Sequence, residues 1–135
     1  MRQDDYFLRQ IDILGRILGK ILTELLKKKS SGEIMDSVEV TAQALKSELD
    51  IDLKSLILVG NENLVEFLKT EKKFGDQHLE KMAELFFILG QDIKNEKALL
   101  YLEKSVTIYE YLNKTSSTYS LDRIYKIDKI KKMIS

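Results

Sequence analysis

The chain has 135 residues, of which 44% are hydrophobic and 33% charged, a composition typical of one globular domain spanning residues 1–135 and not of a disordered chain. It contains no cysteine, which excludes disulfides, thiolate nucleophiles and cysteine metal sites. Its 22 basic and 22 acidic side chains cancel, so no overall field attracts nucleic acid or an anionic membrane.

The first predicted helix, Asp4–Lys29, is the longest apolar periodic segment of the chain. Its apolar residues recur at steps of three and four, which places them on one face. The main row is Phe7, Ile11, Leu14, Leu18, Ile21 and Leu25, and the second row is Leu8, Ile13, Ile17, Leu22 and Leu26. Because this face is wider than one neighbouring helix covers, we expect it to point inward and to contact more than one neighbour.

Two glycines, Gly15 and Gly19, lie inside this helix, where each costs about 1 kcal/mol relative to alanine. Because they are four residues apart, they form a smooth patch beside the apolar stripe. We interpret the patch as the place where another helix crosses closely. The alternative is a binding groove.

Six further helical segments are predicted from apolar spacing, separated by glycines and polar residues. They are Glu33–Leu49, a short helix within Ile51–Val59 capped by Asp52, Asn61–Lys69, Asp76–Leu89, Glu96–Asn113 and Leu121–Ile134. Asn61 and Asp76 are expected to be N-caps, and Gly90 is expected to end the helix that Asp76 begins. Thr70–Gly75 and Lys114–Ser120 are predicted as polar connectors.

The apolar spacing also predicts which faces are buried. The helix predicted in 96–113 has two apolar rows, which imply neighbours on both of its sides. The first row is Leu99, Leu102, Val106 and Tyr109, and the second row is Tyr101, Ser105, Ile108 and Leu112. The last helix is expected to point inward with Leu121, Ile124, Ile127, Ile130 and Ile134. These patterns predict an all-α fold, a bundle of about six helices.

Residues 4–22, DDYFLRQIDILGRILGKIL, resemble the opening of an uncharacterised bacterial all-helical family, a domain of unknown function. That family typically begins with an aspartate–tyrosine pair, an arginine three residues on, and then an apolar helix. The positions that carry the resemblance are Asp5, Tyr6, Arg9, Ile11, Arg16, Lys20 and Ile21. An acidic second helix, a short apolar turn and helical hairpins follow in the same order. The resemblance therefore covers most of the chain, and it implies a fold without an assigned function.

A second resemblance is to tetratricopeptide hairpins, in which a small residue lets the second helix nest against the first. The second helix would contain Glu96, Lys97, Ala98, Tyr101, Leu102 and Lys104 to Ile108, preceded by Leu85, Phe86 and Leu89 to Gly90 in the first. Ser105 stands where alanine is usual, and the proline that ends a repeat is missing. The resemblance implies antiparallel hairpins. One hairpin without a second copy does not form the concave groove of tandem repeats.

Residue patterns that carry chemistry are missing from the sequence. His78 is the only histidine, with no HExxH spacing, and near a helix start we expect it to be a surface or cap-adjacent residue. There is no Glu-x-x-His pair for a di-iron site, and Gly15 and Gly19 are not part of a phosphate loop. We therefore expect no enzyme, with no catalytic, cofactor-binding or metal-binding residues.

No secretory signal is recognisable, because Asp4 and Asp5 stand where a basic region belongs. The recurring charges Arg9, Asp12 and Arg16 also argue against a membrane span, which needs about 20 predominantly apolar residues. We therefore expect a cytoplasmic protein.

The charges are distributed unevenly along the chain. Residues 1–29 carry seven basic and four acidic groups (net +3), and residues 30–70 carry three basic and eight acidic groups (net −5). Residues 71–113 carry six basic and eight acidic groups (net −2), and residues 114–135 carry six basic and two acidic groups (net +4). Basic ends and an acidic middle favour packing of the ends near the centre of the same chain or of another copy. Ordinary solvated helix faces are the simpler explanation.

The leading hypothesis is a non-enzymatic helical module that acts through protein contacts, including self-association through the first helix. The competing hypothesis is a binder of an anionic membrane surface or nucleic acid through the basic N- and C-terminal segments. It draws on aromatic residues interleaved with cations, which can stack bases and meet phosphates. The tyrosines are Tyr101, Tyr109, Tyr111, Tyr119 and Tyr125, and the basic C-terminal cluster is Arg123, Lys126, Lys129, Lys131 and Lys132. Asp122 and Asp128 interrupt that cluster, so we expect no nucleic-acid binding.

Overall fold

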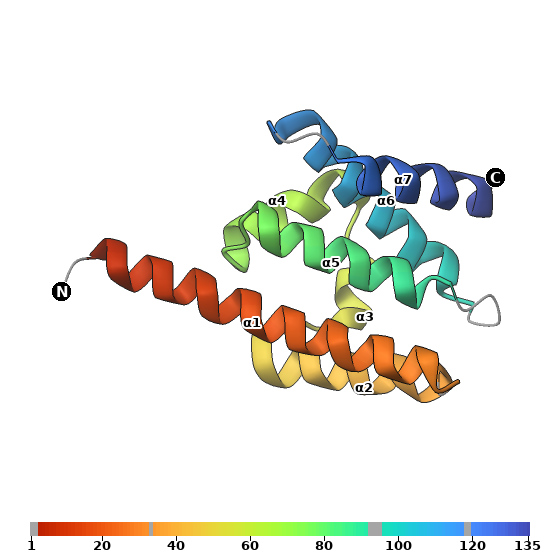
Figure 1. Ribbon diagram of the computed structural model, residues 1–135, viewed down its shortest axis with the longest axis horizontal. Helices are drawn as coiled ribbons and strands as arrows, with labels where there is room; N and C mark the ends of the chain where they lie inside the picture. Colours follow the sequence, from red (N-terminus) through yellow and green to blue (C-terminus); the bar gives the residue numbers. More distant parts are fainter. Residues whose placement is uncertain (1–2, 33, 92–95, 118–119) are drawn as a thin grey trace.

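The computed structural model describes residues 3–32, 34–91, 96–117 and 120–135, and within them the chain forms seven helices and no strand (Figure 1). They are α1 (Gln3–Ser30), α2 (Ile34–Leu49), α3 (Leu53–Leu56), α4 (Asn61–Glu71), α5 (Asp76–Leu89), α6 (Ala98–Thr115) and α7 (Leu121–Ile134). The predicted all-α bundle is confirmed. The bounds of the long helices lie within two residues of the predicted ones, and Glu33, the predicted start of the second helix, lies outside the described residues.

Helix α5 lies at the centre of the molecule, with α1 on one side and α6 on the other (Figure 1). A helix in this position must be apolar almost all round. Its side chains without exposed surface include Leu79, Met82, Ala83, Leu85 and Phe86. Both apolar rows predicted for α6 are buried, except that Leu99, at the start of one row, is half exposed.

The turn after α5 brings α6 back against it. A Cβ atom on Gly90 would lie 2.6 Å from the side chain of Leu102, so only glycine allows this approach. Gly90 has φ −79°, which any residue can adopt. The close approach of Leu102, and not the backbone conformation, therefore requires glycine here. Gly90 is the C-cap of α5, as predicted.

Helices α1 and α2 form an antiparallel hairpin, with Gly32 in the left-handed region (φ +82°) in the turn between them (Figure 1). The second half of α1 packs against α5. The buried apolar residues of the hairpin are Leu18, Ile21, Leu22 and Leu25 from α1 and Leu45 from α2, and α2 also buries Ser37 and Thr41. The hairpin is the outer layer of the bundle.

Two predicted N-caps were wrong by one residue. Gly60 and Gly75 are the N-caps of α4 and α5, and Asn61 and Asp76 take the first helical position instead. Asp76 still faces the positive end of α5, and Glu62 lies in the first turn of α4. The predicted cap of α3 is confirmed, because the Asp52 carboxylate accepts the backbone N–H of Lys54 at 3.1 Å.

The predicted connectors are shorter than expected. Helix α4 continues to Glu71 and α6 to Thr115, so each takes up part of the polar segment that follows it. Phe74, inside the first connector, is buried. In α7, Ile130 is buried as predicted, but the inward prediction was wrong for Leu121 and Ile124, which are exposed because the inward face of α7 begins at Arg123 and continues through Ile127, Ile130 and Ile134.

Candidate functional site

A groove of about 500 Å³ runs along the outer face of the α1–α2 hairpin. Its residues come from one side of each helix, because positions three and four apart share a face. The apolar lining is Ile13, Ile17, Ile21 and Leu25 from α1, with Val40 and Ala44 from α2. Val40 and Ile13 are each more than one third exposed. The groove is therefore an apolar surface that no other element of the chain covers.

The rim of the groove is charged. Arg16, Lys20, Glu24 and Lys28 follow the α1 side at helical spacing, and Glu48 lies on the α2 side. Arg16, Lys20 and Glu48 form no ion pair with any described residue. Charges of both signs are thus available at the edges of an apolar floor.

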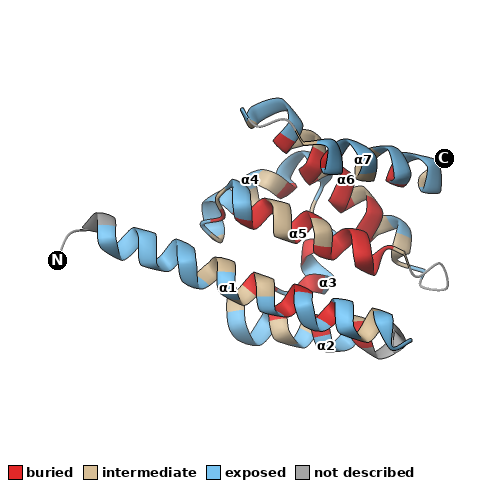
Figure 2. Cartoon of the chain, in the orientation of Figure 1, coloured by how far each residue is buried: buried red, intermediate tan, exposed pale blue. Residues whose placement is uncertain are grey.

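The first part of α1 projects beyond the body of the molecule. Residues 5–13 are all exposed, and Figure 2 shows this half of the helix in the exposed colour. Tyr6 and Phe7 are each 58% exposed and Leu8 is 61% exposed. We call residues 5–13 the overhang. The prediction that Phe7 and Ile11 point into the core was wrong, because the stripe continues past the point where α5 begins.

His78 is the residue that joins α5 to α1. Its Nδ1 accepts the backbone N–H of Gly75 at 2.8 Å, and its Nε2 lies 3.0 Å from the carbonyl oxygen of Ile11. Since Nδ1 is an acceptor, the proton is on Nε2, which donates to Ile11. The residue is cap-adjacent as predicted, but the surface prediction was wrong because its side chain is 0% exposed.

Burial lowers the pKa of His78, because a charged imidazolium loses its hydration there. The hydrogen bond to Ile11 acts in the opposite direction, and the nearby charge of Lys81 lowers the pKa further. His78 is therefore a structural, neutral histidine at physiological pH.

The glycine patch lies at this crossing. A Cβ atom on Gly15 would lie 3.9 Å from the His78 ring, and one on Gly19 would lie 3.8 Å from Cε of Lys81. Both residues face side chains of α5 rather than its backbone. A neighbouring helix does cross α1 here, but the expected close approach of another backbone was wrong, because both distances are ordinary contacts with side chains. The groove lies on another face of α1, and its lining does not include the two glycines.

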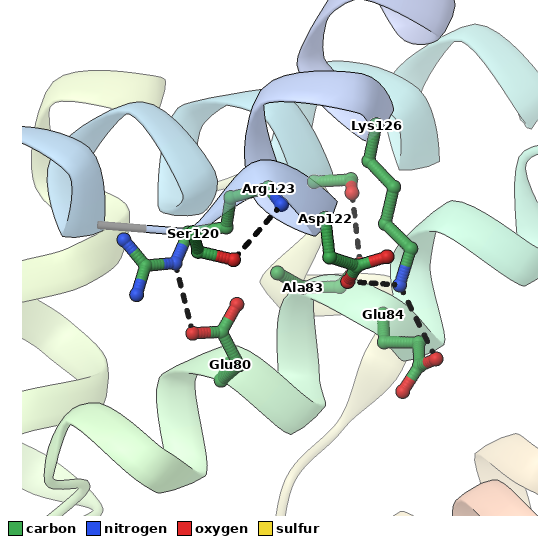
Figure 3. A network of polar contacts seen from close by, with 8 residues as sticks. Glu80, Ala83, Glu84, Ser120, Asp122, Arg123 and Lys126 are labelled. Atoms are coloured by element: carbon green, nitrogen blue, oxygen red, sulfur yellow. Dashed lines mark hydrogen bonds and ion pairs between the residues drawn. The ribbon is translucent and has the colours of Figure 1, made fainter. Parts of the chain in front are cut away.

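Cations of the basic C-terminal cluster bind acceptors of the same chain. Arg123 is 5% exposed, and its Nε donates to Glu80 Oε1 at 3.0 Å while its Nη1 donates to Asn113 Oδ1 at 3.0 Å. Lys126 lies 3.3 Å from Glu84 and 3.1 Å from Asp122. Figure 3 shows the two cations extending from α7 toward these carboxylates. They dock α7 on α5.

The tyrosines are mostly structural. Tyr101 and Tyr109 are buried, and burial raises the pKa of both hydroxyls. The Tyr111 hydroxyl accepts a hydrogen bond from Lys69 Nζ at 2.7 Å. Tyr125 is exposed, and Tyr119 lies outside the described residues. The aromatic residues near the last basic cluster thus form no continuous exposed platform for bases in the described part of the chain.

Lys104 is a buried cation that the sequence pattern did not single out. Its Nζ donates to the carbonyl oxygen of Val59 and, at 2.7 Å, to Asn61 Oδ1. Burial lowers the pKa of this amine. The residue fastens the segment before α4 to α6. Its position on the apolar side of α6 interrupts the hydrophobic rows, and this interruption is the only sign of a buried cation in the sequence.

Within the described ranges, no group of three His, Cys, Asp or Glu side chains has the arrangement of a metal site. None of the described helices is long and apolar enough to cross a bilayer. Comparison of the chain with protein-family models, with curated proteins and with solved structures gives no match.

Proposed function

We propose that this protein is a non-enzymatic helical module that binds another protein through the groove between α1 and α2 and the adjoining overhang. The observation that carries the proposal is the groove itself, an apolar floor with charged edges on the outer layer of the bundle. Exposed apolar surface that adjoins polar edges is typical of interaction sites. The overhang adds Tyr6 and Phe7, aromatic residues of the kind that protein interfaces favour.

The groove fits an amphipathic helix. Two neighbouring antiparallel helices leave a furrow into which the side chains of a third helix can pack at an interaxial distance of about 8–10 Å. Apolar residues of the partner would contact Ile17 and Val40, and its charged residues would meet Lys20 and Glu48 at the rim. This is the helix-in-groove mode of recognition.

The competing function is binding of an anionic membrane surface or nucleic acid through the basic ends. In its favour, the overhang presents Arg9 beside Tyr6 and Phe7. Against it, Arg123, Lys126, Lys131 and Lys132 of α7 all form ion pairs with carboxylates of the same chain. We therefore place this second function behind the first.

Affinity capture from host-cell extract with groove variants tests the proposal. Val40→Glu places a charge in the groove, and Leu58→Glu is the matched control, because Leu58 is an exposed apolar residue outside it. We expect a partner that the wild type and Leu58→Glu retain and Val40→Glu loses.

Equal retention by both variants, or no retained partner, contradicts the proposal. Binding to phosphatidylglycerol vesicles or single-stranded DNA that disappears in high salt, and that Val40→Glu leaves intact, would support the competing function.

A further inference from the structure

The groove between α1 and α2 contains a polar group within its apolar floor, the hydroxyl of Thr41. This side chain lines the groove and is only 4% exposed. In other helices of the chain, Thr23, Thr107 and Thr115 each donate to the carbonyl oxygen four residues earlier. Thr41 forms no side-chain hydrogen bond with any residue that the structure describes. Its hydroxyl is therefore a donor and an acceptor without a partner in the single chain.

The Thr41 hydroxyl opens into the groove. Among the described residues, every fully buried polar side-chain atom has a hydrogen-bond partner. Since the hydroxyl has none, its oxygen must keep contact with solvent, and the groove is the surface that Thr41 lines. An occupant that covered it with apolar atoms alone would leave the hydroxyl buried and unpaired, which costs free energy. A fitting occupant therefore places a polar group opposite Thr41.

The α1 rim of the groove carries two cations that are available to an occupant. Arg16 and Lys20 are exposed and four residues apart, which is one turn and about 6 Å along the helix. Neither forms an ion pair with a residue in the described ranges. The acidic residue farther along this rim, Glu24, lies 3.8 Å from Lys27 and is already paired. The part of the rim around Arg16 and Lys20 is therefore positive.

The α2 rim carries the opposite charge at the same level. Arg16 lies 14 residues before Ser30, the end of α1, and Glu48 lies 14 residues after Ile34, the start of α2. The two positions are therefore level in the antiparallel hairpin, yet no ion pair joins them. The apolar floor lies between them. Carboxylates of an occupant are thus attracted to the α1 side and repelled from the α2 side.

We infer that the occupant of the groove is an amphipathic helix with two carboxylates one turn apart on one flank, which lie against Arg16 and Lys20. Its apolar face carries one polar side chain opposite Thr41. The inference rests on the proposed function and specifies the chemistry of the partner. A helix fits because acidic residues four apart on it share a face and repeat the spacing of the two cations. Glu48 keeps the acidic flank on the α1 side.

Two synthetic peptides test the inference by fluorescence anisotropy with the full chain. Each has about 18 residues, because shorter isolated helices are marginal in water. Both carry leucines at steps of three and four with one asparagine among them. They differ at two flank positions one turn apart, which are glutamate in the Glu peptide and lysine in the Lys peptide. The wild type should bind the Glu peptide about tenfold more tightly than the Lys peptide.

Charge reversal on the protein should reverse this preference. A variant with both Arg16→Glu and Lys20→Glu should bind the Lys peptide more tightly, because both pairs again join opposite signs. The matched control combines Lys54→Glu with Lys114→Glu, since both side chains are exposed and lie outside the groove. It has the same change in net charge and should keep the preference of the wild type.

Thr41→Val tests the polar contact, because it replaces the hydroxyl by a methyl group. It should weaken binding of the Glu peptide about fivefold, since the asparagine then lacks its partner. A Glu peptide with leucine in place of the asparagine should bind Thr41→Val at least as tightly as it binds the wild type.

Equal affinity of the wild type for the Glu and Lys peptides overturns the inference, as does a preference that the charge-reversed variant keeps. Equal losses of the asparagine and leucine versions on Thr41→Val overturn it as well. If both peptides bind equally and Val40→Glu abolishes both, the inference fails and the proposed function stands. If neither peptide binds, the inference fails, and the capture experiment with Val40→Glu decides the proposed function separately.

Discussion

His78 connects two helices through the two nitrogens of one ring. One nitrogen accepts from the backbone of Gly75 at the start of α5, and the other donates to Ile11 in α1. Only the neutral ring can do both, because an imidazolium has no acceptor. Gly15 lies against the same ring, so the small residue and the histidine belong to one contact.

Acid should therefore destabilise the protein through His78. Its pKa is lowered in the folded state from 6.5, so the unfolded chain binds the proton more tightly. Its contribution to stability is complete above 6.5 and falls as the pH decreases through 6.5 toward the folded pKa. Thermal unfolding of the wild type across this range should show a falling Tm, and His78→Gln should reduce the slope. An unchanged slope in His78→Gln contradicts this account.

Substitution at Gly15 should depend on size. A Cβ atom there is in ordinary contact with the His78 ring, so Gly15→Ala should raise the free energy of unfolding by up to about 1 kcal/mol through helix propensity. Gly15→Leu should lower the Tm, because the atoms beyond Cβ meet the ring.

Chemical denaturation of both variants measures the difference at Gly15. Gly19→Ala, which faces Lys81, is the control for propensity alone. A Gly15→Leu variant more stable than Gly15→Ala would show that the patch faces solvent.

At the scale of elements, α7 is attached by charges as much as by apolar contact. Ile130 is its buried apolar residue, while Arg123 and Lys126 reach the carboxylates of Glu80 and Glu84 on α5 (Figure 3). Lys126 also lies over the ring of Phe87, 5.7 Å from its centroid. Such contacts orient a helix whose apolar face is narrow.

Arg123→Ala should loosen α7 selectively. It removes a buried guanidinium and leaves two acceptors without a donor, and since Glu80 is 40% exposed the cost should be about 1–2 kcal/mol. Hydrogen exchange should accelerate in 121–134 and remain unchanged in α1 and α2.

Lys132→Ala is the control for α7, because its pair with Asp128 is exposed and contributes less than about 0.5 kcal/mol. Equal effects of the two substitutions would show that the Arg123 contacts do not hold α7.

At the scale of the whole molecule, the core that stabilises the fold is separate from the surface that we propose for binding. The core lies between α5 and its neighbours, α1 and α6, and the overhang is exposed beyond it (Figure 2). The groove lies on the outer layer, between α1 and α2. A protein can therefore lose contact residues of the outer layer and keep its fold.

Deletion of residues 1–10 should leave the Tm nearly unchanged, because residues 5–10 are exposed and the Ile11 carbonyl that His78 contacts is retained. Deletion of 121–135 is the comparison, and it should lower the Tm because Arg123 and Ile130 are buried. Circular dichroism during heating measures both. A large loss of stability in the first deletion would mean that the overhang packs on the chain that carries it.

Apolar spacing predicted the helices well, but it predicted the tertiary contacts between them poorly. It predicted the bounds of α1 and α7 closely, but it extended the buried stripe of α1 to Phe7, because a repeating pattern contains no information about where the neighbouring helix stops. In α7 it selected Leu121 as inward, whereas the buried residue there is Arg123, which an apolar pattern does not count. It also missed the burial of His78 and Lys104, whose nitrogens donate to acceptors in distant segments. The groove between α1 and α2 was not predicted as such.

By itself, the sequence determined the helices, their turns and the absence of thiol chemistry, since these follow from residue spacing and residue type over a few positions. The tertiary structure alone decided that α5 is central, that Gly15 meets His78, and that the outer face of α1 and α2 forms an uncovered groove. The physical reason is that local periodicity fixes which side of a helix is apolar, whereas packing between distant segments fixes how much of that side is covered.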